Sequence, residues 1–200
     1  MLISYQKKII LASTSEIRKK ILNEVGLEFL TISPDFDEEE AKKNKKLSSK
    51  ELAIFLAKEK ALSVSKNYPD CYVIGSDQVC EFQKKQISKS KNIAEAINQL
   101  NKMNGKTHFQ NNAVVVAFNK KIIFSAFSKA ELKMRKISVK EIESYVKSDQ
   151  SFGCAGSYKY ESLGKHIFEK VDGDYYSILG LNIQPLLNFL YKNKIIKISS

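Results

Sequence analysis

The sequence is poor in the residues that mark disulfide-rich, zinc-binding or disordered proteins. Its 200 residues include three cysteines, two histidines, three prolines and eight glycines. An odd number of widely spaced cysteines does not form a disulfide framework, so we expect a reducing compartment. No CxxC or HxxxH spacing indicates a zinc site. The shortage of glycine and proline, beside 43% hydrophobic residues, excludes a fibrous or disordered chain and predicts a protein with a substantial core.

Long apolar runs are also missing. No stretch of about 18 apolar residues is present, so we predict no membrane-spanning helix. The N-terminal segment has charges but no long apolar run behind them, so we expect no signal peptide and a cytoplasmic location. We find no internal repeat and no long linker, and a chain of this length fits one domain over residues 1–200.

Positive charge is abundant, with a formal net charge of +11 and a pI near 9.4. This balance is compatible with nucleic acid, an anionic membrane or a small polyanion as partner. The lysines are spread over the whole chain, and their densest run, residues 42–46, directly follows the acidic segment 35–40. We interpret most of these charges as solvated surface, so charge alone identifies no partner.

Hydrophobic periodicity predicts strand–helix units combined with a long hairpin, which favours an α/β chain with a mixed sheet. Helix starts are marked at Ser48, Asn92 and Ser138, each of which precedes a glutamate by three residues. Strands are predicted at 8–11, 28–33, 71–76, 79–87 (as a hairpin), 107–118, 121–135 and 166–171, and helices at 17–25, 48–66, 92–105, 138–147 and 185–192.

The turn after the first strand is a candidate anion site. A helix N-terminus presents free backbone N–H groups and a positive dipole end. The Ser13 hydroxyl and the Arg18 guanidinium would add side-chain donors there. A capping box between Ser13 and Glu16 is the structural alternative. The glycine-rich P-loop pattern is absent, which excludes a Walker A site.

Carboxylates that follow predicted strands form a candidate metal site. Asp77 ends an apolar strand in the sequence Gly75-Ser-Asp-Gln78, and ligand groups collect at the carboxyl ends of strands in open α/β sheets. A carboxylate there can bind Mg²⁺ or activate a water molecule, although capping of a turn is an equal alternative. One acid of segment 35–40 could supply a second ligand, because Mg²⁺ needs only one or two protein carboxylates.

The glycine-rich loop 153–161 is a candidate base-binding segment, since Glu161 can accept hydrogen bonds from the N1–H and N2–H groups of guanine. Cys154 and His166 as nucleophile and base form an alternative, but no local signature or orienting partner supports it. RNA binding is another, but no RNP, KH or helix-turn-helix signature is present. We interpret His108 and His166 as structural.

Taken together and in order, these motifs resemble those of the Maf family over nearly the whole chain. The matching segments are 11–18 (LASTSEIR, against LASxSPRR), 34–38 (PDFDE), 58–61 (KEKA), 74–79 (IGSDQV, against GxD[TQ]V), 154–158 (CAGSY) with Glu161, and 173–181 (GDYYSILGL).

The resemblance implies an elongated α/β fold of the ITPase-like kind, with a twisted mixed sheet flanked by helices and two lobes around a central cleft. It implies hydrolysis of a nucleoside triphosphate to the monophosphate and pyrophosphate, with Mg²⁺ or Mn²⁺ as cofactor. It further implies a small-molecule nucleotide as substrate and a homodimer, and it gives no reason to expect a nucleic acid partner.

Roles follow from the motifs by resemblance. Asp77 would be the general base that activates the attacking water, and Glu38 would bind the metal together with Asp77. Phosphoryl chemistry needs positioning, metal and positive charge rather than covalent help. Side chains that would hold the triphosphate or neutralise its charge are Ser13, Arg18, Lys60 and Lys89.

Three residues fall at the positions tied to base choice, namely Ile17, Gln78 and Glu161. Segments 76–80 (SDQVC) and 154–157 (CAGS) resemble the branch that prefers 7-methyl-GTP, whereas the branch that acts on dTTP and UTP usually has threonine at position 78. A carboxylate at position 161 suits a guanine edge better than a pyrimidine. N7-methylation makes the base cationic, which favours stacking on an aromatic ring. The same reaction on dTTP, UTP or another nucleotide is the alternative.

The chain departs from the family pattern at three places. Residues 15–17 (SEI) replace the usual SPR, which puts an acid beside the expected phosphate site and leaves no aromatic at position 17. Residues 88–90 (SKS) replace GKP, and residues 112–113 (NA) replace Thr-Gly. These changes make a weakly active nucleotide- or RNA-binding protein the competing prediction from another class.

Overall fold

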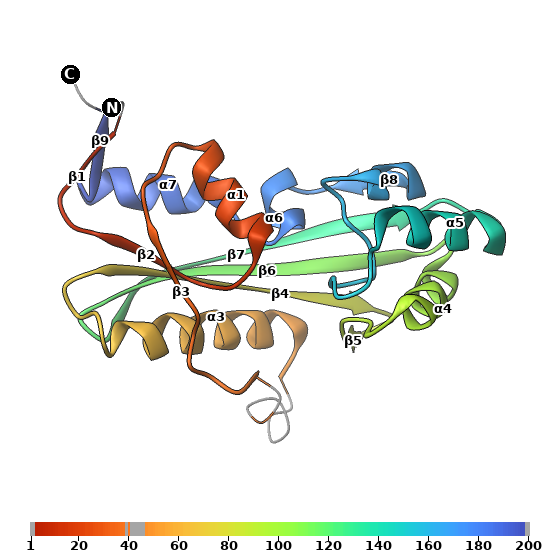
Figure 1. Cartoon of the computed structure of the whole chain (residues 1–200), viewed down its shortest axis with the longest axis horizontal. Helices are drawn as coiled ribbons and strands as arrows, with labels where there is room; N and C mark the ends of the chain where they lie inside the picture. The colour runs from red at the N-terminus through yellow and green to blue at the C-terminus, as the bar shows by residue number, and fades with distance from the viewer. Residues whose placement is uncertain (1–2, 39, 41–46, 199–200) are drawn as a thin grey trace.

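The computed structural model describes residues 3–38, 40 and 47–198, and the lysine-rich run 42–46 lies outside this part of the chain. Figure 1 shows an elongated body in which the long strands β4, β6 and β7 run along most of the molecule. The two described ends of the chain meet at one end of it, where β1 (Ile3–Tyr5) pairs antiparallel with β9 (Ile196–Ile198). Among the described helices, none is both long and apolar enough to cross a bilayer.

A mixed sheet forms the centre, as the sequence predicted. Its strands follow the order β3-β2-β4-β6-β7-β8, and β5 pairs with the far end of β4. β2 runs parallel to both β3 and β4, whereas the other pairings are antiparallel. The strands are β2 (Ile9–Ala12), β3 (Leu30–Ile32), β4 (Tyr72–Phe82), β5 (Lys85–Ile87), β6 (Thr107–Phe118), β7 (Lys121–Met134) and β8 (Phe168–Asp172).

Helices cover both faces of the sheet and divide the molecule into two lobes (Figure 1). In the first lobe, α3 (Ser49–Ser65) packs on one face, while α1 (Glu16–Glu24), α6 (Tyr175–Leu179) and α7 (Ile183–Lys192) lie on the other. In the second lobe, α4 (Ile93–Met103), α5 (Val139–Asp149) and the 3-10 helix η1 (Leu163–Ile167) surround the far ends of β6, β7 and β8. Each lobe has its own buried apolar side chains, so the predicted elongated, two-lobed architecture is confirmed.

Local signals placed most of these helices correctly. The hydroxyls of Ser48 and Ser138 accept hydrogen bonds from the N–H groups three residues later, and both capping boxes are complete. Asn92 caps α4 in the same way. These residues satisfy N–H groups that have no partner within the helix, which is why the pattern marks a helix start.

The strand predicted over residues 71–76 is longer in the structure, and its extra length changes the position of the site. The strand expected over 71–76 continues through Asp77 as β4 and ends only at Phe82, where a two-residue turn leads into β5. Gln83 and Lys84 form this turn with φ of 50° and 61°, the left-handed geometry that joins tightly paired antiparallel strands. The predicted hairpin is therefore confirmed, but it belongs to the same strand as Asp77.

Other boundaries moved for tertiary reasons. β3 is shorter than the predicted 28–33, and the strand predicted at 166–171 begins only at Phe168, because the preceding residues form η1. The short elements β1, β9 and α6 were missed. A strand of three residues has too few positions to show a period and forms only because a distant partner pairs with it.

His108 is completely buried in the second lobe. Its Nε2 lies 2.9 Å from the hydroxyl of Tyr158, while its Nδ1 has no hydrogen-bond partner among the described residues. Burial lowers the pKa of His108 from 6.5 to about 4, because an imidazolium would lose its hydration without gaining a countercharge. The imidazole is therefore neutral in the folded protein at physiological pH.

We predict that His108 makes the protein less stable in acid. Between pH 6.5 and 4 the unfolded chain binds a proton at His108 and the folded chain does not, so the free energy of unfolding falls as the pH falls. The full effect is about 3 kcal/mol. Urea unfolding from pH 7 to pH 4 should show a flatter pH dependence for His108→Gln than for the wild type. The exposed His166→Gln is the control, and equal slopes for the wild type and His108→Gln would contradict the prediction.

Candidate functional site

A gap along one edge of β4 creates the site. On that edge β2 pairs with β4 only as far as Leu11 and Ile74, and β5 begins to pair only at Cys80. Over the intervening residues, no described strand covers this edge. Asp77 therefore lies beside the carboxyl end of β2, and the prediction that it ends its own strand is wrong.

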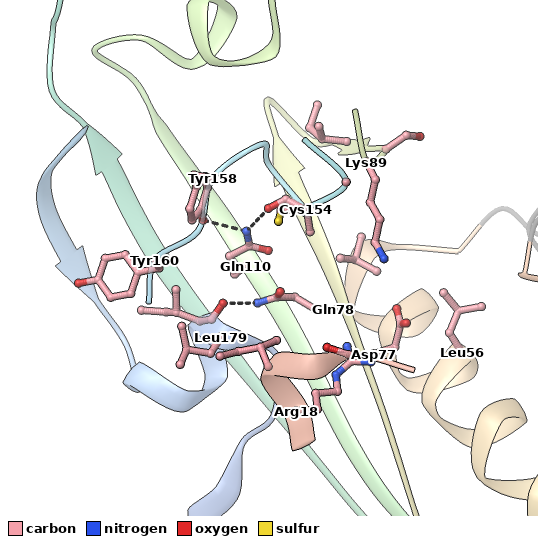
Figure 2. A pocket seen from close by; sticks show the side chains of 18 of the residues that line it. Arg18, Leu56, Asp77, Gln78, Lys89, Gln110, Cys154, Tyr158, Tyr160 and Leu179 are labelled. Atoms are coloured by element: carbon pink, nitrogen blue, oxygen red, sulfur yellow. Dashed lines mark hydrogen bonds between the residues drawn. The ribbon is translucent and has the colours of Figure 1, made fainter. Parts of the chain in front are cut away.

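Both faces of β4 contribute to one cavity of about 530 Å³ at this gap (Figure 2). Asp77 points toward α3, whereas Gln78 points to the opposite face and contacts the backbone of α6. The cavity brings together every site residue expected from the sequence except Ser13: Ile17, Arg18, Glu38, Lys60, Asp77, Gln78, Lys89 and Glu161.

An ammonium between two carboxylates forms the acidic side of the cavity. Lys60 Nζ lies 2.6 Å from Oδ1 of Asp77 and 2.6 Å from Oε1 of Glu38. Lys60 and Asp77 are each only 7% exposed, so the ion pair between them is shielded from water. Burial makes such charges costly unless they are paired, and here the lysine serves both acids.

Gly75 allows α3 to approach the strand closely enough for these contacts. A Cβ atom at this position would lie 2.3 Å from the carbonyl oxygen of Ala57 and 2.9 Å from the Cβ of Ala61. Gly75 and Asp77 are two residues apart on one strand and so face the same helix. The missing side chain at position 75 thus lets Lys60 reach Asp77.

Arg18 is half-buried at the start of α1, where it faces the same cavity. Its Nε donates to the carbonyl oxygen of Gly180 at 2.8 Å, and its Nη1 lies 3.4 Å from the Ser13 hydroxyl. Burial lowers the pKa of the Arg18 guanidinium from its ordinary value, and the carboxylates Asp77 and Glu38 act in the opposite direction. Ser13 therefore lies behind the cavity and helps to orient Arg18.

The N-terminus of α1 does not use the capping box that was the structural alternative. Ser15 is the N-cap, and its side chain makes no capping hydrogen bond. Glu16 pairs with Lys19 at 2.7 Å and its side chain is 85% exposed. The acid that replaces the family's proline thus faces solvent with its charge paired, and Ser15 lines the cavity instead.

Gln78 is fixed by the backbone of α6. Its Nε2 donates to the carbonyl oxygens of Ser177 at 3.0 Å and Ile178 at 2.7 Å, which uses both N–H groups. Figure 2 shows one of these two hydrogen bonds. The side-chain oxygen is then the only polar atom of Gln78 left for a ligand, and an amide oxygen can only accept hydrogen bonds.

The loop 153–161 closes the cavity on the side of the second lobe. Gln110 on β6 donates to the carbonyl oxygen of Ala155 at 3.0 Å and to the hydroxyl of Tyr158 at 2.8 Å, which holds the loop against the sheet (Figure 2). Gly156 has φ of 85°, and a Cβ there would lie 2.8 Å from the Tyr158 ring. Glu161 and Tyr160 line the cavity from this loop, and the ring of Tyr160 packs beside Phe168 and Tyr175, with ring centroids 5.9 Å apart in each pair.

Sequence reasoning missed several lining residues, because their side chains reach the cavity only through the tertiary fold. Gln110 belongs to a strand that the sequence placed but did not connect to the site. Tyr158 was part of a quoted motif without a role. The other lining residues missed in this way include Ser15, Lys91 and Tyr160.

The carboxylates of Glu38 and Asp77 suit a divalent cation. Two acidic oxygens already converge on one cationic group, the Lys60 ammonium. Mg²⁺ and Mn²⁺ take oxygen ligands, and Mg²⁺ usually keeps several waters beside one or two carboxylates. In the part of the chain that the structure describes, no group of three or more His, Cys, Asp or Glu residues is placed so that it could hold a metal ion. That part offers the few ligands typical of Mg²⁺ shared with phosphates.

The alternative nucleophile and base, Cys154 and His166, do not come together at the cavity. Cys154 lines it, but burial raises the pKa of the Cys154 thiol, and the Glu161 carboxylate acts in the same direction. His166 is exposed on η1 and does not line the cavity. A neutral thiol without a neighbouring base is a poor nucleophile, so this alternative is not supported.

Comparison with known proteins shows similarity to a single family over most of the chain. A family model described as Maf-like protein matches residues 8–193. A nucleoside triphosphate pyrophosphatase of Legionella pneumophila subsp. pneumophila (strain Philadelphia 1) is 39% identical over 96% of this chain and 97% of its own. One of Bradyrhizobium diazoefficiens is 40% identical over 95% and 96%. A 7-methyl-GTP pyrophosphatase of Bartonella quintana (strain Toulouse) is 40% identical over 90% and 92%.

We predict that Gly75→Ala destabilises the first lobe. The added methyl group meets the backbone of α3, which cannot move alone, so the free energy of unfolding should fall by about 1–3 kcal/mol. Urea unfolding measures this directly. Gly153→Ala is the control, because a Cβ at that position meets nothing within 4 Å and only its φ of 80° causes strain. A smaller loss for Gly75→Ala than for Gly153→Ala would show that α3 does not need this close approach.

Proposed function

The chain belongs to the Maf family, and from this premise we propose that it is a nucleoside triphosphate pyrophosphatase that releases pyrophosphate and a nucleoside monophosphate. The arrangement of Lys60 between Asp77 and Glu38, in one cavity with Arg18 and Lys89, carries this proposal. Arg18 and Lys89 are cations on two walls of the cavity, and the carboxylates of Asp77 and Glu38 lie between them. This arrangement suits a substrate with a chain of phosphates and a bound metal ion.

Arg18, Lys89 and the N-terminus of α1 would bind the triphosphate. Arg18 is held by Gly180 and Ser13 and so presents its remaining N–H groups in a fixed direction, which favours charge-assisted hydrogen bonds to phosphate oxygens. Lys89 reaches the cavity from the opposite wall (Figure 2). Lys60 would neutralise negative charge that develops on the phosphates.

Glu38 and Asp77 would hold the divalent metal, Mg²⁺ or Mn²⁺. When bound, such an ion neutralises phosphate charge and makes the leaving pyrophosphate a better leaving group. Asp77 would also accept a proton from water as the water oxygen bonds to the α-phosphorus. The bond from that phosphorus to the oxygen bridging to the β-phosphorus then breaks, and pyrophosphate leaves.

The base would lie between Gln78, Glu161 and Tyr160. The side-chain oxygens of Gln78 and Glu161 accept hydrogen bonds, which suits the N–H groups on the Watson–Crick edge of guanine. Stacking adds no support here, because Ile17 is not aromatic and the ring of Tyr160 packs beside Phe168 and Tyr175. From the hydrogen-bond acceptors and the resemblance of Gln78 to one branch of the family, we propose 7-methyl-GTP as substrate. The same reaction on dTTP or UTP is the alternative.

Three further properties are also proposed. A single functional domain over residues 1–200 and a cytoplasmic location rest on the sequence, and a homodimer rests on the family resemblance. The competing prediction of a weakly active nucleotide- or RNA-binding protein gains no support from the departures that motivated it. Glu16 pairs with Lys19 outside the cavity. Ser90 is buried, and its hydroxyl is hydrogen-bonded to that of Ser157.

The first experiment measures pyrophosphate release with Mg²⁺ from 7-methyl-GTP, GTP, UTP, dTTP and CTP. We expect the highest kcat/KM with 7-methyl-GTP, and Asp77→Asn should lower kcat by about 10²- to 10⁴-fold because it removes the proton acceptor. The exposed Asp172→Asn on β8 is the matched control. Near-wild-type turnover of Asp77→Asn would rule out its role as base, and preference for UTP or dTTP would move the enzyme to the alternative substrate class.

We predict that Glu161→Ala reduces discrimination between bases rather than the rate of the chemistry. Loss of one hydrogen-bonding carboxylate should lower the preference for guanine over uracil nucleotides by about tenfold. The ratio of kcat/KM for 7-methyl-GTP and UTP measures this effect. The control is Glu169→Ala, which removes an exposed carboxylate of β8. An unchanged ratio would show that Glu161 does not contact the base.

A further inference from the structure

Hydrogen bonds form a ring with the backbone of residues 88–90 and tie the segment around Lys89 to the loop 153–161. The N–H of Gly153 donates to the carbonyl oxygen of Ser90 at 2.8 Å. The Ser157 hydroxyl lies 2.9 Å from that of Ser90 and 2.7 Å from Oε1 of Gln99. Gln99 Nε2 donates to the carbonyl oxygen of Ser88 at 2.9 Å, which completes the ring.

The direction of each hydrogen bond in this ring is determined by chemistry. Oε1 of Gln99 can only accept, so the single proton of the Ser157 hydroxyl goes to Gln99. Ser90 therefore supplies the proton shared by the two serine hydroxyls. The Ser157 hydroxyl thus accepts from Ser90 and donates to Gln99, and consecutive hydrogen bonds of this kind strengthen one another where they are buried.

The two serine hydroxyls of the ring are buried, whereas Gln99 is half-buried and its hydrogen bond to Ser88 is exposed. Ser157 is 0% exposed and Ser90 is 2% exposed. Ser157 also has φ of 62°, a left-handed conformation that is unfavourable for a residue with a side chain. Strain of about 1–3 kcal/mol persists only where surrounding contacts enforce it, and it clusters at functional sites.

The ring encloses the backbone of Lys89. On one side of Lys89, the carbonyl oxygen of Ser88 accepts a hydrogen bond from Gln99. On the other side, the hydroxyl of Ser90 bonds to Ser157 and its carbonyl oxygen accepts from Gly153. Ser88, Lys89 and Lys91 are exposed, so apolar packing does not fix this segment. Lys89 itself has no role in the ring and directs its side chain to the cavity (Figure 2).

We propose that Ser90, Gln99 and Ser157 are positioning residues that place the Lys89 ammonium for phosphate binding. This inference rests on the proposed role of Lys89 in the pyrophosphatase reaction. The ring also links Lys89 to the loop that carries Glu161, so the phosphate side and the base side of the cavity form one hydrogen-bonded unit.

The test is a double-mutant cycle on kcat for pyrophosphate release from the best nucleotide of the substrate panel. Gln99→Met keeps the length of the side chain and the helix but removes both ring contacts. We expect it to lower kcat about tenfold, because a small displacement of a charged group from its productive position is costly. Lys89→Ala should lower kcat about 100-fold. Adding Gln99→Met to Lys89→Ala should change kcat less than twofold further.

Ser157→Ala tests the ring from the loop side and should show the same lack of additivity with Lys89→Ala. Gln184→Met is the matched control, because its side-chain hydrogen bond to Asn188 lies on the surface of α7. Wild-type kcat in Gln99→Met and Ser157→Ala, or equal fold losses with and without Lys89, would overturn the positioning role while leaving the proposed function intact. Wild-type kcat in Lys89→Ala would instead remove Lys89 from the proposed mechanism, and the positioning role with it.

Discussion

The ammonium group of Lys60 lies between the carboxylates of Asp77 and Glu38, and the cavity depends on this arrangement. Two acids so close together would repel each other without it, and Asp77 is too deeply buried to rely on water for charge stabilisation. Their approach requires α3 to lie almost against β4, which Gly75 permits. A backbone position without a side chain therefore governs a charge arrangement two residues away.

On the opposite face of β4, the backbone of residues 177–180 positions the side chains of Arg18 and Gln78. The carbonyl oxygen of Gly180 accepts hydrogen bonds from both Arg18 and the buried Ser76, while the two carbonyl oxygens at the end of α6 hold Gln78. Gly180 has φ of 109°, which favours glycine. One short segment thus orients a phosphate-side residue and a base-side residue, and their spacing follows from its conformation.

Two residues that depart from the family pattern, Ser90 and Asn112, form hydrogen bonds with neighbouring parts of the fold. Ser90, where proline is usual, contributes a hydroxyl and a carbonyl oxygen to the ring around Lys89. Asn112, where threonine is usual, donates to the carbonyl oxygen of Asp77 at 3.1 Å and accepts from the N–H of Asn182 at 3.0 Å. The side chains of Ser90 and Asn112 are buried and have hydrogen-bond partners, whereas an unpaired polar group in such a position would cost about 1–3 kcal/mol.

Helix starts, the long hairpin and the mixed character of the sheet were predictable from the sequence, because caps such as Ser48 and alternating apolar residues act through near neighbours. The family motifs also identified the residues that meet at the cavity. The sequence did not predict that β4 runs past Asp77, that Ser13 lies behind Arg18, or that Gln110 and Ser157 hold the base-side loop. Those features depend on contacts between residues far apart in the chain, such as the 17 positions between Lys60 and Asp77 or the 58 between Gln99 and Ser157. Only packing of the whole fold sets such distances, because no local preference encodes where a neighbouring strand stops or which loop a buried hydroxyl will meet.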